Sequence, residues 1–287
     1  MSETPFELDK WLPEVCRIAY EAGCQISTLY HQNERLAVDM KGDGTPVTEA
    51  DKQADEFIST ALQALTPHIP LVTEESVADV PFETRSDWAC YWLVDPLDGT
   101  KEFIERTGEF SVNIALIVNH EPVLGVVYGP EGGDCYFSIK GQPAYKLPGL
   151  IPIDKPFNWP VLIHQADTIK VNQITEWQGI KIAVSRRHGG MIQRYIAQLG
   201  HAELIHMGSA LKTCLVAEGR ADIYPRFGPT SLWDTAAAHC ILNSAGGAVL
   251  NAAGHPLQYV QTASLLNPFF IAVCSEDAHW PAFPAVL

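Results

Sequence analysis

The first third of the chain carries hydrophobic residues at the spacing of two amphipathic helices. In residues 12–29, apolar side chains recur every three or four positions, which places them on one face of a helix. The same period returns in residues 50–65. Thr48 is followed three residues later by Asp51, a pattern that predicts a capping box at the start of the second helix. Between the helices, residues 41–48 have the composition of a turn.

The pattern then changes to short apolar runs of the kind that form β-strands. Three such runs occupy residues 91–94, 111–118 and 122–128, with Gly, Pro and Asp between them. We therefore expect a β-sheet to follow the two helices. Four prolines at positions 148 to 160 interrupt the pattern, because neither a helix nor a central strand tolerates them well. We place a domain boundary or an irregular insertion in this segment.

Strand and helix patterns alternate in the remainder of the chain. In order, the sequence predicts a strand at 180–185, a helix from about residue 191, a strand at 202–206, a helix at 209–218, a strand at 221–224 and an alanine-rich helix at 234–244. This βαβα order is typical of an α/β fold. The chain is therefore expected to combine an α+β domain, residues 1–160, with an α/β domain, residues 161–287.

Charge and hydropathy narrow the classes of function. The 287 residues include 34 acidic and 19 basic side chains, which gives a formal net charge of −15. Such a chain lacks the broad basic face that nucleic acids and anionic membranes attract, so no nucleic acid is expected as a partner, and no obligate protein partner is evident. Because no apolar run reaches the roughly 18 residues of a spanning helix and residues 1–10 lack a secretory pattern, we expect a cytoplasmic protein. Loose attachment to the inner face of the cell membrane stays open.

The most informative segment is residues 92–100, with the sequence WLVDPLDGT. An apolar strand leads to Asp95, Pro96 ends the strand pairing, and Asp98 begins a turn. Two carboxylates therefore emerge three residues apart at the end of a strand. Hard divalent cations bind carboxylate oxygens of this kind, although the same residues are also common in plain surface turns.

Two further acidic positions strengthen the prediction of a metal site. Glu74 and Glu75 close the short apolar segment 70–72, and Asp234 stands between Trp233 and the alanine-rich helix. Either glutamate could be a solvated loop charge, and Asp234 has the position of a helix N-cap. A cap can still offer its second oxygen to an ion. A set of carboxylates without histidine favours Mg²⁺ or Mn²⁺ over zinc.

Small and basic residues near these motifs indicate a phosphate site. Two Mg²⁺ ions about 3.5 to 4 Å apart clamp the attacking and leaving oxygens in phosphoryl transfer. Backbone amides at a turn, and a helix that begins at Gly208-Ser209, could bind the phosphate. A single basic residue is more often a solvated surface charge. Only the clustering of several such residues near the acidic motifs indicates a phosphate site. The candidates are Gly99, Thr100, Lys101, Gly208, Ser209, Lys212 and Arg226, together with His188 at the end of a predicted strand.

Four motifs in this order resemble the Mg²⁺-dependent, lithium-sensitive phosphatase superfamily that includes the inositol monophosphatases. They are Thr48-Glu49-Ala50-Asp51, Glu74-Glu75-Ser76, residues 92–100, and Trp233-Asp234-Thr235-Ala236-Ala237 with Gly246-Gly247 behind it. The resemblance covers about residues 40 to 250. It implies the layered αβαβα sandwich of these enzymes, with metal ligands mainly in the first domain and a nucleotide pocket completed by the second.

Within the superfamily, the chain resembles most the bacterial 3'(2'),5'-bisphosphate nucleotidases of sulfur metabolism. The features that carry this likeness are residues 98–103, Lys212 with residues 215–219, residues 225–230 and residues 266–270. The likeness implies hydrolysis of the 3'-phosphate of adenosine 3',5'-bisphosphate (PAP) to AMP by a metal-activated water. Action on PAPS, the sulfated nucleotide with the same 3'-phosphate, to give APS stays open.

Carried over residue by residue, the resemblance implies a role for each candidate. Glu74, Asp95, Asp98, Asp234 and the carbonyl of Leu97 would bind two or three Mg²⁺, which Mn²⁺ could replace. Asp51 and Thr100 would orient and deprotonate the attacking water. The substrate would contact Glu74, Asp98, Gly99, Thr100, Lys101, Ser185, His188, Gly208, Lys212, Arg226 and Asp234. Ser209 is added only because it stands at the expected helix N-terminus.

Two alternatives stay open at this point. The same scaffold could act as an inositol monophosphatase or a sugar bisphosphatase. A different class is a non-catalytic protein that binds a nucleotide or a divalent ion through the acidic site. Lys101, Lys212 and Arg226 favour a substrate with more than one phosphate over inositol 1-phosphate. Asp51 and Thr100 beside the metal ligands favour an enzyme over a binding protein, which would not need them.

Overall fold

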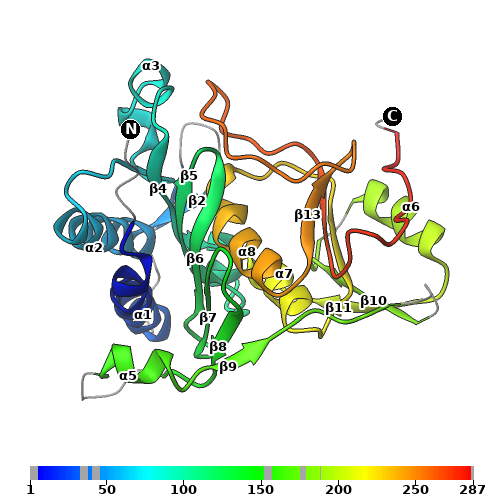
Figure 1. Ribbon diagram of the computed structural model, residues 1–287, viewed down its shortest axis with the longest axis horizontal. Helices are drawn as coiled ribbons and strands as arrows, with labels where there is room; N and C mark the ends of the chain where they lie inside the picture. Colours follow the sequence, from blue (N-terminus) through cyan, green and yellow to red (C-terminus); the bar gives the residue numbers. More distant parts are fainter. Residues whose placement is uncertain are drawn as a thin grey trace.

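The chain stacks its elements in five layers, in the order αβαβα (Figure 1). The computed structural model describes residues 6–32, 38–40, 46–151, 157–174, 179–187 and 189–285. Its helices are α1 (Leu8–His31), α2 (Glu49–Leu65), the 3-10 helix η1 (Val77–Asp79), α3 (Phe82–Arg85), α4 (Thr100–Ile104), α5 (Trp159–Ile163), α6 (Gly190–Leu199), α7 (Leu211–Ala217) and α8 (Leu232–Ser244). The expected layered sandwich is confirmed.

The first sheet has seven strands, and both of its faces are buried. In spatial order the strands are β3 (Leu71–Thr73), β4 (Cys90–Asp98), β5 (Ser111–Val118), β6 (Glu121–Gly129), β7 (Asp134–Ile139), β8 (Ala144–Leu147) and β9 (Asp167–Ile169). Only β3 and β4 pair in parallel. Successive side chains of β5 alternate between two cores, with Ile114 and Leu116 in one and Ala115 and Ile117 in the other.

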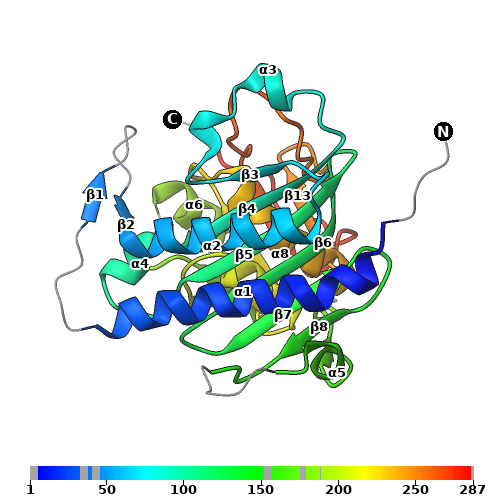
Figure 2. The same cartoon turned by 90° about the vertical axis from the view of Figure 1, so that its left-hand side faces the viewer.

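Helices α1 and α2 cover one face of this sheet and lie side by side (Figure 2). Their apolar stripes form the first core, as the sequence pattern predicts. Thr48 caps α2: its Oγ1 accepts from Ala50 N, while Thr48 N donates to Asp51 Oδ2 at 2.7 Å. The predicted capping box is therefore confirmed, and it fixes the position of the Asp51 carboxylate.

Helix α8 fills the layer between the two sheets. It is buried along most of its length and apolar on all sides, which is typical of a helix covered on every face. It contacts strands β4 to β8 on one side and β13 on the other. The close approach requires Gly125 of β6, because a Cβ atom there would lie 2.4 Å from the carbonyl oxygen of Ala237.

The second sheet has five strands and completes the sandwich. In spatial order they are β11 (Ala202–His206), β10 (Ile180–Val184), β12 (Ile223–Arg226), β14 (Phe270–Val273) and β13 (Ala248–Asn251). β10 pairs in parallel with β11 and β12, whereas β14 is antiparallel to both neighbours. α7 lies beside α8, and α6 packs on the outer face through a third core.

Several predicted elements differ from the observed ones. Residues 46–48 of the predicted turn form strand β2 (Pro46–Thr48), which pairs with β1 (Val38–Met40), while residues 41–45 lie outside the described part. Pro160 lies in the first turn of α5, where a missing N–H costs no hydrogen bond. The strand predicted at 221–224 occupies 223–226, since residue 221 still belongs to the turn that ends α7.

The division at residue 160 stays a prediction. Strand β9, which lies beyond that position, pairs with β8 at the edge of the first sheet. The five strands of the second sheet all lie within residues 161–287. Among the helices described above, none has both the length and the apolar character that crossing a bilayer requires.

Candidate active site

The end of β4 supplies the centre of the site. Its pairing with β5 shifts register between Asp95 and Asp98, so both carboxylates leave the sheet at an irregular strand end. Asp95 Oδ1 accepts from Leu97 N at 3.0 Å. Gly99 has a φ of 96°, and a Cβ there would lie 3.3 Å from the backbone of residues 109–110. The predicted turn is therefore a tight one that only glycine adopts without strain.

Three carboxylates from different elements converge beside this turn. Oxygen atoms of Glu74, Asp95 and Asp234 all lie within 4.8 Å of one another. Glu74 follows β3, and its N–H donates to the carbonyl of Val94 at 3.1 Å. Because β3 runs parallel to β4, the carboxyl ends of the two strands meet at one edge of the sheet.

Asp234 reaches the same point from the start of α8. The sequence pattern placed it at the N-cap, but Ser231 occupies that position and Asp234 is the third helical residue. Its Oδ2 accepts from Ser231 N at 3.0 Å in a capping box. Helix α8 begins two residues earlier than predicted, at Leu232, and Asp234 therefore lies inside its first turn. Asp234 is therefore both a partner in the helix cap and a member of the carboxylate cluster.

Burial and mutual repulsion perturb these carboxylates. Burial raises the pKa of Asp95 well above its usual range, and the charges of Glu74 and Asp98 raise it further. The pKa of Asp234 is raised in the same way, by burial and then by Asp98 and Glu74. One buried and two half-buried carboxylates that repel one another are the donor set that a hard divalent cation satisfies, so the residues present fit such an ion.

Asp51 and Thr100 form a hydrogen-bonded pair next to the cluster. Thr100 Oγ1 donates to Asp51 Oδ1 at 3.0 Å and lies 3.4 Å from the carbonyl oxygen of Leu97. The other oxygen of Asp51 accepts from Thr48 N at 2.7 Å and from Thr48 Oγ1 at 2.6 Å. Since Asp51 is only 2% exposed, these donors hold its carboxylate in one orientation.

Asp98 connects the first sheet to the loop between β11 and α7. Its Oδ2 accepts from Asn113 Nδ2 at 3.2 Å and from Ala210 N at 2.6 Å. Burial raises the pKa of Asp98 to about 6, although the charge of Lys212 and these hydrogen bonds oppose the rise. The side chain therefore fixes the loop before α7 to the end of β4.

The predicted helix start at Gly208-Ser209 is wrong. Ser209 has a φ of 49°, and α7 begins only at Leu211. The Ala210 amide is already bound to Asp98, so it is not free for an anion. Gly208 packs against Glu109, whose carbonyl oxygen would lie 2.2 Å from a Cβ at position 208. These residues position the loop, and Ser209 still lines the pocket.

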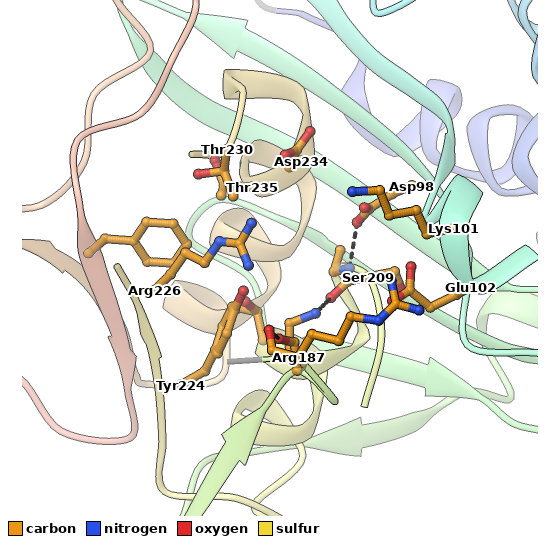
Figure 3. Close-up of a pocket in the computed structure, with 16 residues that line it drawn as sticks. Asp98, Lys101, Glu102, Arg187, Ser209, Tyr224, Arg226, Thr230, Asp234 and Thr235 are labelled. Atoms are coloured by element: carbon orange, nitrogen blue, oxygen red, sulfur yellow. Dashed lines mark hydrogen bonds between the residues drawn. The ribbon is translucent and has the colours of Figure 1, made fainter. Parts of the chain in front are cut away.

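A pocket of about 280 Å³ adjoins the carboxylate cluster. It shares Asp98, Gly99, Lys101 and Asp234 with a neighbouring hollow of about 460 Å³ that also contains Glu74, Asp95, Leu97 and Thr100. Figure 3 shows acidic Asp98 and Asp234 at one side of the pocket and Arg226 and Tyr224 at the other. The site thus has an acidic end and a basic, aromatic end.

Lys212, which is buried, and Arg226, which is half-buried, supply the positive charge of the basic end. Lys212 Nζ donates to the carbonyl of Ser209 at 2.7 Å and lies 5.2 Å from the ring centroid of Tyr224. Burial lowers the pKa of Lys212 to about 8, although Asp98 opposes the change. Arg226 Nη2 donates to the carbonyl of Pro229 at 2.8 Å. Both cations therefore lie in fixed positions at the pocket wall.

Most predicted site residues lie around these two adjoining hollows. Those that line one or both are Glu74, Asp95, Leu97, Asp98, Gly99, Thr100, Lys101, Ser185, Ser209, Lys212, Arg226 and Asp234. Asp51 contacts the site through Thr100, and Gly208 supports the loop behind it. His188 falls outside the described residues.

Sequence reasoning missed several residues that line the pocket. They are Glu102, Arg187, Ala210, Thr213, Tyr224, Thr230, Thr235 and Phe270. Motif position could have found some of them, because Thr230 ends the 225–230 loop and Phe270 ends the 266–270 segment. Tyr224 and Phe270 stack edge to face, with ring centroids 5.8 Å apart, in paired strands β12 and β14. Their pairing needs the sheet order, which local patterns do not reveal.

Comparisons with known proteins agree with this architecture. The sequence pattern of the inositol monophosphatase family matches residues 7–275. The chain is 42% identical over 261 residues to the 3'(2'),5'-bisphosphate nucleotidase CysQ of Escherichia coli (strain K12), across 90% of this chain and 98% of the relative. The crystal structure of CysQ from Bacteroides thetaiotaomicron, a bacterial member of the inositol monophosphatase family, has a TM-score of 0.81 at 38% identity. It covers 93% of this chain and 98% of its own.

A more distant structure shares the fold alone. The Thermotoga maritima IMPase has a TM-score of 0.71 at 20% identity and covers 91% of both chains. The five-layer fold and the buried carboxylates beside a basic pocket define a metal-dependent phosphatase. The chain belongs to the inositol monophosphatase family.

Proposed function

We propose that this phosphatase hydrolyses the 3'-phosphate of adenosine 3',5'-bisphosphate to give AMP and phosphate. The observation that carries the proposal is the junction of a three-carboxylate cluster with a pocket lined by Lys212 and Arg226. A substrate with two phosphates matches this arrangement, because the carboxylates can hold cations for one phosphate and the basic side chains can attract the other. The bisphosphate nucleotidases that are 35% to 43% identical to this chain support the same activity.

Glu74, Asp95, Asp98 and Asp234, with the carbonyl of Leu97, would hold the metal ions, and an all-oxygen donor set favours Mg²⁺. When bound, the ions supply positive charge to the reacting phosphate and make a water molecule more acidic. Without them, the buried carboxylates repel a phosphate. Burial, and then the charges of the neighbouring carboxylates, raise the pKa values of Asp95 and Asp234.

Asp51 and Thr100 would orient the attacking water and take up its proton. The Thr100 hydroxyl already directs its own proton to Asp51 Oδ1, so its oxygen lone pairs are free to accept a proton from a water molecule. Thr48 holds the second oxygen of Asp51, which keeps the first oxygen aimed at Thr100. The pair thus forms a short relay from the water to a buried carboxylate.

The substrate would lie with the cleaved phosphate at Gly99 and Thr100 and the nucleoside in the adjoining pocket. Lys101 borders both hollows, so it would contact the cleaved phosphate. The edge-to-face rings of Tyr224 and Phe270, with Arg226 beside them, offer a flat apolar wall for a base. His188 stays a predicted contact of the nucleotide.

Phosphate release by the purified chain tests the proposal. We expect release in Mg²⁺ that is fastest with adenosine 3',5'-bisphosphate, slower with inositol 1-phosphate and fructose 1,6-bisphosphate, and abolished by a chelator. Faster release from the inositol or sugar phosphate would overturn the substrate assignment. No release from any of the three would instead favour a binding protein. The 3'-phosphorylated, sulfated nucleotide PAPS is assayed alongside, and its expected product is APS.

A further inference from the structure

Two consecutive arginines connect the loop after β10 to the segment around α4. Arg186 forms two hydrogen bonds to the carboxylate of Glu109, one of them from Nε to Oε2 at 3.1 Å. Arg187 forms an ion pair with Glu105 through Nη2. Although adjacent in sequence, the two side chains therefore bind different acidic partners, one at the end of α4 and one just before β5.

Only one of these arginines lines the pocket. Arg187 is part of its wall, whereas Arg186 and its partner Glu109 are absent from the lining. Figure 3 shows the Arg187 side chain extending along the pocket edge towards Glu102. The Arg187 side chain is 61% exposed and that of Glu105 is 47% exposed. The guanidinium is thus available to a molecule in the pocket.

The position of Arg187 separates it from the reacting end of the site. Lys101 borders both hollows, but Arg187 lines only the pocket and not the hollow that contains Glu74 and Asp95. Lys212 lines the same pocket, but it is buried and its Nζ is bound to the Ser209 carbonyl, so its charge attracts a phosphate there without replacing the guanidinium contact. A phosphate at Arg187 would therefore not be the one that is cleaved.

The pairing of Arg187 with Glu105 is weak enough to be exchanged. An ion pair between half-exposed side chains contributes little, because water screens both charges. A phosphate monoester carries about −1.5 to −2 charges at neutral pH and can accept two parallel N–H bonds from one guanidinium. A phosphate in the pocket should therefore replace the single carboxylate contact.

We propose that Arg187 binds the phosphate that the enzyme retains, and that it exchanges Glu105 for this phosphate when substrate enters. The proposal rests on the proposed function and names the residue that selects for a second phosphate. Glu105 then acts as a competitor: it keeps the guanidinium at the pocket edge until a phosphate displaces it. Arg187 contacts the substrate away from the reacting atoms, so its role is specificity.

Equilibrium binding of adenosine 5'-monophosphate to the full chain tests this exchange. Calorimetry in the presence of a chelator keeps metal ions from attracting the phosphate to the acidic end. We expect Arg187→Gln to raise the Kd about tenfold, since a charge-assisted contact is lost, and Glu105→Gln to lower it about threefold. Arg186→Gln is the matched control and should leave the Kd unchanged. Adenosine, which lacks the phosphate, should bind all four proteins equally.

The opposite signs distinguish exchange from a structural role. If the Arg187–Glu105 pair only held the loop in place, both substitutions would break it and would shift the Kd in the same direction. That outcome would overturn the proposal, as would equal effects of Arg187→Gln and Arg186→Gln, or binding of AMP no tighter than that of adenosine. Melting temperatures of the three variants show whether each is folded.

Turnover supplies a second readout. For Arg187→Gln we expect the KM for adenosine 3',5'-bisphosphate to rise about tenfold with kcat within about twofold, while the KM for adenosine 3'-monophosphate stays unchanged. Equal losses on both substrates would contradict a role in second-phosphate selection. If the wild-type chain binds AMP as expected but hydrolyses neither nucleotide, the proposed function fails and the phosphate subsite stands.

Discussion

At the scale of single residues, the site depends on hydrogen bonds that give each side chain one orientation. Asp51 is an example, because Thr48 occupies one of its oxygens and Thr100 the other. Asp98 is another, since it binds both Asn113 and the Ala210 amide. In each case one residue serves the site and also holds neighbouring segments together by hydrogen bonds. A substitution must therefore be chosen to separate the functional role from the structural role.

Thr100 offers such a separation. Thr100→Val keeps the shape of the side chain but removes the hydroxyl that donates to Asp51, so we expect kcat to fall by about 10²- to 10⁴-fold. Thr100→Ser restores the hydroxyl and should retain most of the activity. Phosphate release at saturating substrate measures both variants, and their melting temperatures serve as the control. Full activity of Thr100→Val would exclude the proposed proton relay.

Lys212 makes ligand binding depend on pH. Its pKa is lowered to about 8, mainly by burial, so the side chain loses its charge within the accessible range. The protonated lysine favours phosphate binding, and only about a tenth of the molecules carry this charge near pH 9. We therefore expect the Kd for AMP to be about tenfold higher near pH 9 than near pH 7. Calorimetry at the two pH values measures the change. Lys212→Arg keeps its charge and should flatten the profile; an equally steep profile in that variant would assign the effect to another group.

At the scale of elements, close packing of α8 against β6 places Asp234 beside the strand ends. Gly125 permits this contact, since a Cβ there would lie 2.4 Å from the Ala237 carbonyl oxygen and 2.8 Å from Cys240 Cβ. We expect Gly125→Ala to lower the free energy of unfolding by about 1 to 3 kcal/mol, because backbone must shift to admit the methyl group.

Gly132 provides the matched control for this substitution. No atom lies within 4 Å of a Cβ built at Gly132, so Gly132→Ala should be neutral or slightly stabilising. Urea unfolding compares the two variants through their midpoints, with the slope expected to stay constant. An unchanged midpoint for Gly125→Ala would mean that α8 can move away from β6 without cost.

The elements that the sequence predicted correctly are those fixed by local rules. The two N-terminal helices follow from a period near 3.6, and the Thr48–Asp51 cap follows from spacing alone. The left-handed Ser209 could not be predicted in this way, because its conformation accompanies a contact between the Ala210 amide and Asp98, 112 positions away. Likewise, the exposure of Arg187 to the pocket depends on how the two sheets are placed.

At the scale of the whole molecule, the carboxylate cluster couples metal binding to stability. A carboxyl whose pKa is higher in the folded than in the unfolded chain binds its proton more tightly when folded. Its stabilising effect is therefore complete below the unfolded pKa and is lost as the pH rises through the folded pKa. Asp95 and Asp234 have raised pKa values, so the stability of the metal-free protein falls as the pH rises above the unfolded pKa of these carboxyls.

Magnesium should therefore raise the melting temperature. A ligand present at about 100 times its Kd stabilises the folded state by about 2.7 kcal/mol, which for a chain of this size corresponds to about 4 to 5 °C. Asp95→Asn removes one repelling charge, so we expect a higher melting temperature in chelator and a much smaller response to Mg²⁺. Thermal unfolding with and without Mg²⁺ measures both effects. Equal Mg²⁺ responses in the two proteins would place the ion elsewhere.

The middle layer also determines what happens if the chain is cut. Cleavage between residues 151 and 157 would leave Glu74 and Asp95 on one fragment and would put β9, α8 and Asp234 on the other. Each fragment would expose the apolar surface that α8 covers or provides, so neither should be active or stable by itself. Together the fragments would regain the acidic cluster and the missing edge strand. The enzyme is therefore suited to fragment complementation. If each fragment is fused to a different protein, phosphate release would report that these two proteins bind each other.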